Sequence, residues 1–147
     1  IGVPMPDVLD SDKNAVAYNN NETFRFVVVG EICPLKGQDI LVKAIERLSA
    51  SEKKLVSFIL AGRKDNQFTE MRKSLEDITC VELVGDVPRE EMDYIYRDSD
   101  ALICCSRMES LSATVIEAMT HQIPSIVSTA AGITSDLDDI IHNLCNF

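Results

Sequence analysis

Two glutamates, Glu109 and Glu117, stand eight positions apart in the segment CSRMESLSATVIEAM, where an apolar run gives way to a helical pattern. The first falls in the loop before the predicted helix, and the second falls about a turn and a half inside it. A helix amino terminus attracts anions because its first N–H groups are free and its dipole end is positive. The pair therefore predicts a site for a ligand that carries both phosphate and hydroxyl groups.

The alternative interpretation is that both carboxylates are ordinary surface charges, which is what spacing alone favours. The neighbours of Glu117 argue against it, because Val115 and Ile116 precede it and Ala118 and Met119 follow it. A carboxylate among such residues needs a partner, from the protein or from a ligand. Both interpretations stand at this point.

The elements that position these residues follow from the alternation of apolar runs with helical patterns. Strands separated by helices predict a parallel sheet covered on both faces, which is an α/β, Rossmann-like, three-layer domain. Ligands of such sheets bind at the carboxyl ends of the strands, where both Gly30 and Glu109 fall. The predicted strands are 24–30, 55–62, 80–85, 100–106 and 124–129, and the predicted helices are 37–50, 67–77, 88–99 and 112–121, with weak helical character after Gly132.

The turn after the first strand reads GEICPLKGQD and contains no G-x-G-x-x-G motif. This argues against a dinucleotide-dependent oxidoreductase, and the spacing of Lys36 also differs from that of a P-loop. Lys36 precedes a helix whose amino terminus faces the same sheet edge. It is either a solvated surface lysine or a cation that binds the phosphate of a ligand.

Composition narrows the class of partner. A net charge of −10 argues against nucleic acid or an anionic bilayer as the partner. The five cysteines form no C-x-x-C pair, and the two histidines have no metal-ligand spacing, so we expect no metal and no disulfide framework. There is no signal peptide and no apolar run as long as a membrane span, and together these features predict a cytoplasmic protein.

The domain organisation follows from the two ends of the chain. The sequence begins at Ile1 with IGVPMPD and continues with an Asn-rich polar stretch. We therefore expect residues 1–23 to be an interdomain connection and linker within a longer protein. Residues 24–147 form the predicted domain, and because no closing helix follows NLCNF, we expect it to be trimmed at its carboxyl end.

Four motifs in order carry a resemblance to a known family: G-x(5)-K-G, LAG, VGDVPREEM, and SRMES followed by EAM. They resemble the carboxyl-terminal, donor-binding domain of retaining glycosyltransferases of the GT-B fold, family 4 (group 1), from about Phe24 to Asp136. The resemblance implies one half of a GT-B fold, with the amino-terminal acceptor domain absent from this sequence. It also implies metal-independent, cofactor-free transfer of a hexosyl group from a nucleotide-diphosphate sugar, with UDP favoured, to a sugar, lipid or glycan acceptor.

The resemblance also assigns roles to individual residues. Glu109 matches the catalytic glutamate that contacts the donor sugar, Glu117 the one that binds the ribose hydroxyls, and Lys36 the lysine that pairs with the diphosphate. The other implied donor-binding positions are Gly30 at the nucleotide, Asp86 and Val87 beside the base, and the amides of Ser110, Leu111 and Ser112 near the distal phosphate.

Three departures from the family pattern set the alternatives. Glu31 stands where the family has arginine, and Gln122 stands where it has a helix-ending glycine. Leu111-Ser112 replaces Phe-Gly, and serine there is expected to cap the helix. Because Glu31 would repel a diphosphate, the alternative function is a non-catalytic GT-B-like binding module. A signalling receiver would need clustered aspartates that Glu31 and Asp39 do not supply.

Overall fold

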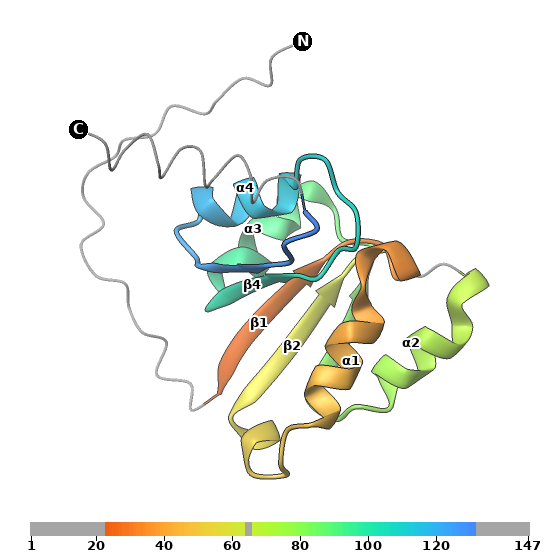
Figure 1. Ribbon diagram of the computed structural model, residues 1–147. Coiled ribbons are helices and arrows are strands. Elements are labelled where there is room, and N and C mark those ends of the chain that lie inside the picture. Colours follow the sequence, from red (N-terminus) through yellow and green to blue (C-terminus); the bar gives the residue numbers. More distant parts are fainter. Residues whose placement is uncertain (1–22, 64–65, 132–147) are drawn as a thin grey trace.

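The computed structural model describes residues 23–63 and 66–131, and they form one α/β layer structure (Figure 1). The expected linker, 1–23, apart from its last residue, the weak helix after Gly132 and the trimmed carboxyl end lie outside the described residues. The strands and helices predicted within the described residues are confirmed, each one to five residues shorter than predicted. They are β1 (Phe24–Val29), α1 (Gln38–Glu46), β2 (Val56–Ala61), α2 (Thr69–Glu76), β3 (Val81–Gly85), α3 (Arg89–Arg97), β4 (Ala101–Cys104), α4 (Ala113–Thr120) and β5 (Ser125–Val127), with short 3-10 turns η1 (Pro34–Lys36), η2 (Glu52–Lys54) and η3 (Asn66–Phe68).

The sheet is parallel throughout, with strand order β3-β2-β1-β4-β5. The central strand β1 pairs with β2 on one side, where Val28 faces Leu60, and with β4 on the other, where Val27 faces Leu102. The chain therefore runs outward from β1 in both directions, and β1 and β4 flank the topological switch point. Loops that leave these two strands meet at one edge of the sheet.

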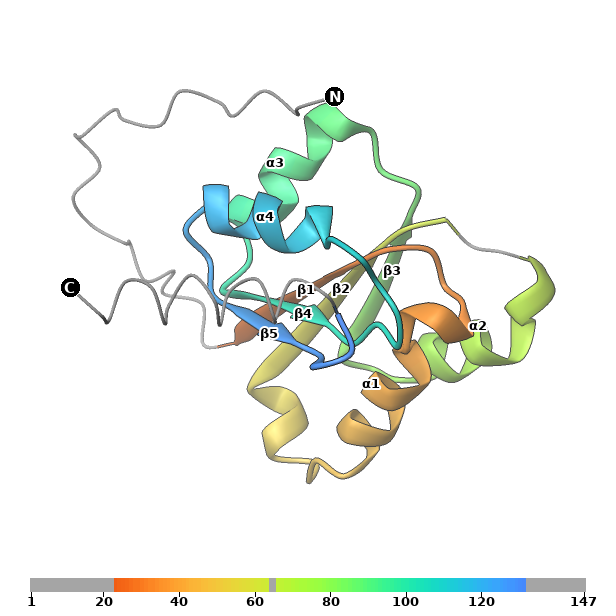
Figure 2. The same ribbon diagram turned by 45° about the horizontal axis from the view of Figure 1, so that its top comes forward.

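Helices cover both faces of the sheet, α1 and α2 on one side and α3 and α4 on the other (Figures 1 and 2). Alternation along β1 explains the two cores, because successive side chains point to opposite faces. Val27 belongs to the core under α3 and α4, and Val28 belongs to the core under α1 and α2. None of the helices in the described ranges combines the length and apolar character needed to cross a bilayer.

Helix α1 buries a face displaced from the stripe that its apolar residues predict. Ile40 belongs to the predicted stripe but is 45% exposed, whereas Leu41, Val42 and Ile45 are buried. The buried face begins at Gln38, whose Nε2 donates to the Glu31 carbonyl at 2.9 Å and whose Oε1 accepts from the Cys33 amide at 3.4 Å. A polar residue thus opens the buried face of α1, because it satisfies the loop that leads from β1.

Candidate functional site

Lys36 and Glu109 meet at the switch-point edge although they are 73 positions apart in the sequence. The Lys36 Nζ lies 3.2 Å from the Glu109 Oε1, and the two side chains are 28% and 16% exposed. The Lys36 side chain passes over Gly30, because a Cβ built on Gly30 would lie 3.4 Å from the Lys36 Cδ. The structure therefore brings together three of the residues that the sequence predicts for the site.

The loops that carry this pair are held together by main-chain contacts. Gly37, at φ 72°, packs so closely against the loop after β4 that a Cβ on it would lie 2.0 Å from the Cys105 carbonyl oxygen. The Cys105 Sγ donates to the Lys36 carbonyl at 3.3 Å, and the Arg107 amide donates to the Leu35 carbonyl at 2.8 Å. Burial raises the pKa of the Cys105 thiol to about 11, so this thiol remains protonated and acts as a donor.

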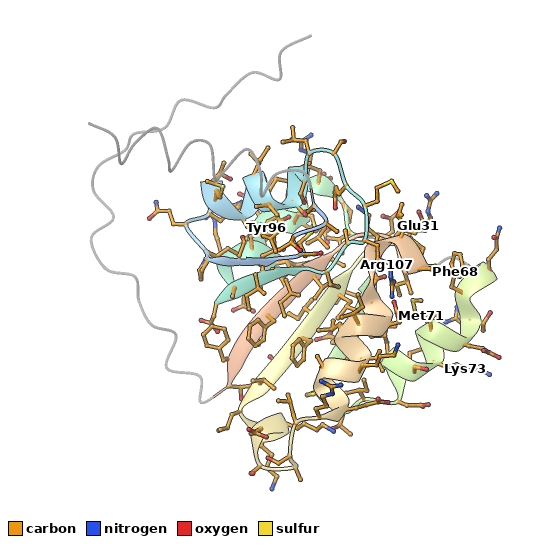
Figure 3. The ribbon with its side chains drawn as sticks, viewed as in Figure 1. Glu31, Phe68, Met71, Lys73, Tyr96 and Arg107 are labelled. Carbon is orange, nitrogen blue, oxygen red and sulfur yellow. The ribbon has the colours of Figure 1, made fainter. Side chains whose placement is uncertain are left out.

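Arg107 adds a side-chain link between the same loops, and the sequence analysis did not identify it. Arg107 lies beside α1 (Figure 3). Its two terminal nitrogens lie 2.7 Å from the two carboxylate oxygens of Asp39, and Nη1 also donates to the Pro34 carbonyl. The Arg107 hydrogen bonds lower the pKa of Asp39. The only indication of this role in the sequence was that Arg107 is a cation two positions before Glu109 in the same loop. Arg107 therefore fixes the loop that bears Glu109 to the start of α1.

A small buried polar cluster holds the second oxygen of Glu109. The Cys104 Sγ lies 3.8 Å from the Glu109 Oε2, 3.7 Å from the Ser112 Oγ and 3.8 Å from the Ser106 Oγ. Thiols make weak hydrogen bonds, so this contact orients the carboxylate without neutralising it. Glu109 is thus fixed by Lys36 on one oxygen and Cys104 on the other.

The amino terminus of α4 lies directly after Glu109 in the sequence. Ser112 occupies the N-cap position, but its hydroxyl makes no capping hydrogen bond, contrary to the prediction. The hydroxyl instead lies 3.0 Å from the Thr114 Oγ1, because the serine side chain is fully buried against Cys104. Within the described residues no protein acceptor takes the N–H groups of residues 111–114, which fits an anion-binding terminus. Ser110 and Leu111 are exposed beside it.

Glu117 has a protein partner that the sequence analysis missed. This partner is Tyr96, labelled in Figure 3. Tyr96 on α3 is only 1% exposed, and its hydroxyl donates to the Glu117 Oε2 at 2.8 Å. Burial raises the pKa of Tyr96 far above its usual value, and the neighbouring carboxylate raises it further. The Glu117 Oε1 makes no hydrogen bond to any described residue. Glu117 is therefore half satisfied, with one oxygen anchored and one available.

Glu31 lies at the carboxyl end of β1 with its carboxylate beside Arg63. The Arg63 Nε is 3.5 Å from the Glu31 Oε1, in a pair whose arginine side chain is 71% exposed. The two turns are in direct contact, since a Cβ on Gly62 would lie 2.0 Å from the Gly30 carbonyl oxygen. Glu31, which stands where the family has arginine, thus lies beside Arg63 from the turn after β2.

The remaining predicted donor-binding residues lie farther along the same edge. Asp86 and Val87 belong to the loop between β3 and α3, and Asp86 is exposed. No hydrogen bond or ion pair joins either of them to Lys36, Glu109 or Glu117 among the described residues. Gln122, which ends α4, adopts the left-handed conformation at φ 60°, as its position in the family pattern implies.

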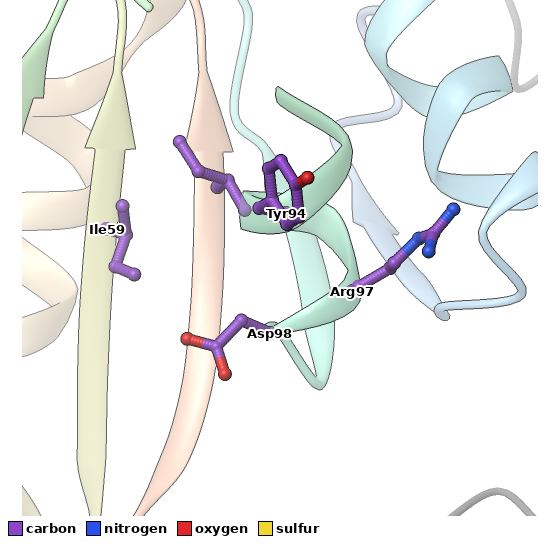
Figure 4. Close-up of a pocket in the computed structure, with 5 residues that line it drawn as sticks. Ile59, Tyr94, Arg97 and Asp98 are labelled. Carbon is purple, nitrogen blue, oxygen red and sulfur yellow. The ribbon is translucent and has the colours of Figure 1, made fainter. Parts of the chain in front are cut away.

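A hollow of about 440 Å³ lies elsewhere, between α3 and the sheet (Figure 4). Its charged lining residues already have partners, since Arg97 pairs with Asp93 and Asp98 pairs with Arg25. The hollow shares no residue with the switch-point edge. In the part of the chain that the structure describes, no three His, Cys, Asp or Glu residues are grouped to hold a metal ion.

Comparison with known sequences gives the family context. The profile of a family described as "Glycosyl transferases group 1" matches residues 10–139. The phosphatidylinositol N-acetylglucosaminyltransferase GPI3 subunit of Saccharomyces cerevisiae (strain YJM789) is 28% identical over 129 residues, 86% of this chain and 28% of that protein. The D-inositol 3-phosphate glycosyltransferase of Mycobacteroides abscessus is 30% identical over 112 residues, 71% of this chain and 24% of that protein. The chain thus spans about a quarter of the length of these curated relatives.

Comparison with solved structures confirms the fold. WaaG, a glycosyltransferase involved in lipopolysaccharide biosynthesis, superposes with a TM-score of 0.68 at 18% identity, over 81% of this chain and 32% of that chain. HepE of Anabaena, solved in complex with UDP and glucose, superposes with a TM-score of 0.66 at 20% identity, over 78% of this chain and 32% of that chain. The Rossmann-like sheet is therefore that of one half of a GT-B fold.

Proposed function

We propose, because this chain belongs to the group 1 glycosyl transferases, that it forms the donor-binding half of such an enzyme. The ligand is a nucleotide-diphosphate sugar, with UDP favoured, and the reaction is metal-independent, retaining transfer of a hexosyl group. The acceptor, a sugar, lipid or glycan, is held by an amino-terminal domain of the same full-length protein. The donor half alone is expected to be inactive, since the reacting cleft needs both domains.

The observation that carries the proposal is the Lys36–Glu109 pair beside the free amides of α4. Cleavage of the sugar–phosphate bond leaves negative charge on the diphosphate, which a lysine and oriented N–H groups stabilise. The sugar carbon gains positive, oxocarbenium character, which a nearby carboxylate stabilises. Lys36 and Glu109 thus supply the two charges that this bond cleavage requires, one for each product of heterolysis.

The contact between Lys36 and Glu109 also indicates what happens when the donor binds. A diphosphate competes with Glu109 for the ammonium group, because it carries more negative charge than a carboxylate. Glu109 remains oriented by Cys104 when Lys36 turns to the phosphate. The clamp through Arg107 keeps the two loops in place during this exchange.

Glu31 favours a second candidate function, a GT-B-like module that has lost donor chemistry. A carboxylate near the diphosphate repels it, and this is the strongest argument for the second candidate. The Arg63 pairing works against it, because the guanidinium offsets the Glu31 charge. If wild-type protein binds no nucleotide and Glu31→Arg creates binding, the non-catalytic module is favoured.

The test of donor binding is titration calorimetry of the full-length protein with UDP, GDP and ADP. We expect one of the three to bind, and Lys36→Met to weaken it by at least about tenfold, because a charge-assisted hydrogen bond is lost. The matched control is Lys54→Met, which removes an exposed lysine at the opposite edge of the sheet, before β2. Wild-type affinity in the Lys36→Met variant, or no binding of any nucleotide, would refute the donor-site assignment.

A further inference from the structure

The buried contact between α3 and α4 is specific at the level of single atoms. Tyr96 projects from α3 into the core beneath α4, where its ring packs with Val27, Leu102 and Val115. Its hydroxyl reaches one oxygen of Glu117, Oε2, at 2.8 Å. The hydrogen bond to Tyr96 therefore holds one oxygen of Glu117 in place and leaves Oε1 without a hydrogen-bond partner among the described residues.

The Tyr96 ring is itself held in place by a second contact. The His121 ring stacks on it with centroids 5.1 Å apart and planes 16° apart. The His121 Nε2 lies 3.2 Å from the Asp93 Oδ1, so α3 holds the histidine from the other side. The Tyr96 ring is packed between core residues and His121. Its hydroxyl therefore cannot turn away from Glu117 without disturbing both α3 and α4.

We propose that Tyr96 is a positioning residue, which fixes the Glu117 carboxylate so that its Oε1 accepts hydrogen bonds from vicinal hydroxyls of a nucleotide ribose. This inference rests on the proposed function, since it takes the bound ligand as a nucleotide-diphosphate sugar and Glu117 as the group that binds its ribose, the role that the family resemblance implies. The high pKa of Tyr96 keeps its hydroxyl protonated across the physiological range, so the donor is permanent. Without that hydrogen bond the carboxylate gains rotamer freedom, and hydroxyl binding must then order it.

A purely structural role for Tyr96 is the competing explanation, since buried tyrosine hydroxyls usually have partners. The two explanations differ in which ligands lose affinity when the tyrosine hydroxyl is removed. A structural tyrosine affects stability, and it affects all ligands alike. A positioning tyrosine affects only ligands whose ribose carries hydroxyl groups.

The experiment compares a ribonucleoside diphosphate with its 2′,3′-dideoxy counterpart by titration calorimetry of the full-length protein, with UDP, GDP or ADP, whichever binds tightest. We expect wild type to prefer the ribonucleotide by at least about tenfold, because two hydroxyls lose their acceptor in the analogue. Tyr96→Phe should weaken the ribonucleotide by about five- to tenfold and leave the dideoxy analogue within about twofold. The matched control, Tyr94→Phe, removes the hydroxyl of a tyrosine on the same helix that is 73% exposed, and should match wild type.

The outcomes separate the inference from the proposed function. If wild type prefers the ribonucleotide and Tyr96→Phe keeps that preference, the positioning role is wrong and the donor site stands. If wild type binds the ribonucleotide and the dideoxy analogue equally well, the ribose role of Glu117 is wrong and the inference falls while donor binding stands. If wild type binds no nucleotide, the proposed function itself is wrong and the inference falls with it.

A crystal structure of wild-type full-length protein with the bound nucleotide checks the same point without relying on the fold of a variant. We expect the Glu117 Oε2 to keep its hydrogen bond from the Tyr96 hydroxyl and the Oε1 to accept hydrogen bonds from the ribose hydroxyls. A Glu117 that leaves Tyr96 on binding would overturn the inference.

Discussion

Gly37 is the position at which a single added methyl group should do most damage to the candidate site. Gly37 adopts φ 72°, which costs an alanine about 1–2 kcal/mol. The added Cβ would lie 2.0 Å from the Cys105 carbonyl oxygen, whereas ordinary C···O contacts are about 3.3 Å or more. The two loops must therefore separate by more than about 1 Å, because the Cβ is rigidly attached to one backbone and the carbonyl oxygen belongs to the other.

That separation breaks the contacts that join the loops. The Arg107 amide would leave the Leu35 carbonyl, now at 2.8 Å, and the Cys105 Sγ would leave the Lys36 carbonyl, now at 3.3 Å. Each lost hydrogen bond costs about 1 kcal/mol. With the backbone strain, Gly37→Ala should lower the free energy of unfolding by about 3–4 kcal/mol, a large part of the stability of a domain.

The assay is urea denaturation followed by circular dichroism. At slopes of about 1–3 kcal/mol per molar urea, the midpoint should fall by about 1–4 M. The control is Gly30→Ala, which also places alanine at positive φ, 143°, but whose Cβ meets only the flexible Lys36 side chain, at 3.4 Å. We expect it to cost about 1–2 kcal/mol. If Gly37→Ala costs no more than Gly30→Ala, the reasoning from the backbone collision is refuted.

Two further predictions concern the carboxyl end of α4 and the pair formed by Arg107 and Asp39. Gln122 holds φ 60° after α4, so Gln122→Gly should raise the free energy of unfolding by about 0.5–1 kcal/mol, measured by thermal denaturation; an unchanged Tm would contradict it. Arg107 lowers the folded-state pKa of Asp39, so the stability from this pair is complete above the unfolded pKa of about 3.9 and is lost as pH falls through the lower folded value. Asp39→Asn should therefore lower Tm by a constant amount between about pH 5 and 7, and the difference should shrink below about pH 4; a difference that persists at pH 2 would argue against the linkage.

Sequence patterns predicted most of the architecture, because alternation of apolar strands with amphipathic helices leaves few topologies open. In helix α1 the hydrophobic pattern predicted the buried face incorrectly. Its predicted stripe included Ile40, which is exposed, and omitted Gln38, which is buried. Hydrophobic periodicity treats a polar residue as surface, and only the structure shows the carbonyl and amide that Gln38 satisfies.

The capping role predicted for Ser112 failed for a related reason. Serine is a favoured N-cap, and Ser112 does occupy that position. The burial of its hydroxyl next to Cys104 decides its contacts instead. Local propensity gave the position of the residue, and tertiary packing gave the partner.

By itself the sequence predicted the parallel α/β class, the sheet edge expected to bind a ligand, and Gly30, Lys36, Glu109 and Glu117 as candidate site residues, because the alternation of strands with helices and the motif spacing are local properties of the sequence. Only the tertiary structure decided which side chains meet. It pairs Lys36 with Glu109, and Tyr96 with Glu117. It also places Arg107 on Asp39 and Arg63 on Glu31. These contacts join loops and helices that are far apart in the chain, and their geometry follows from how the sheet brings those segments together.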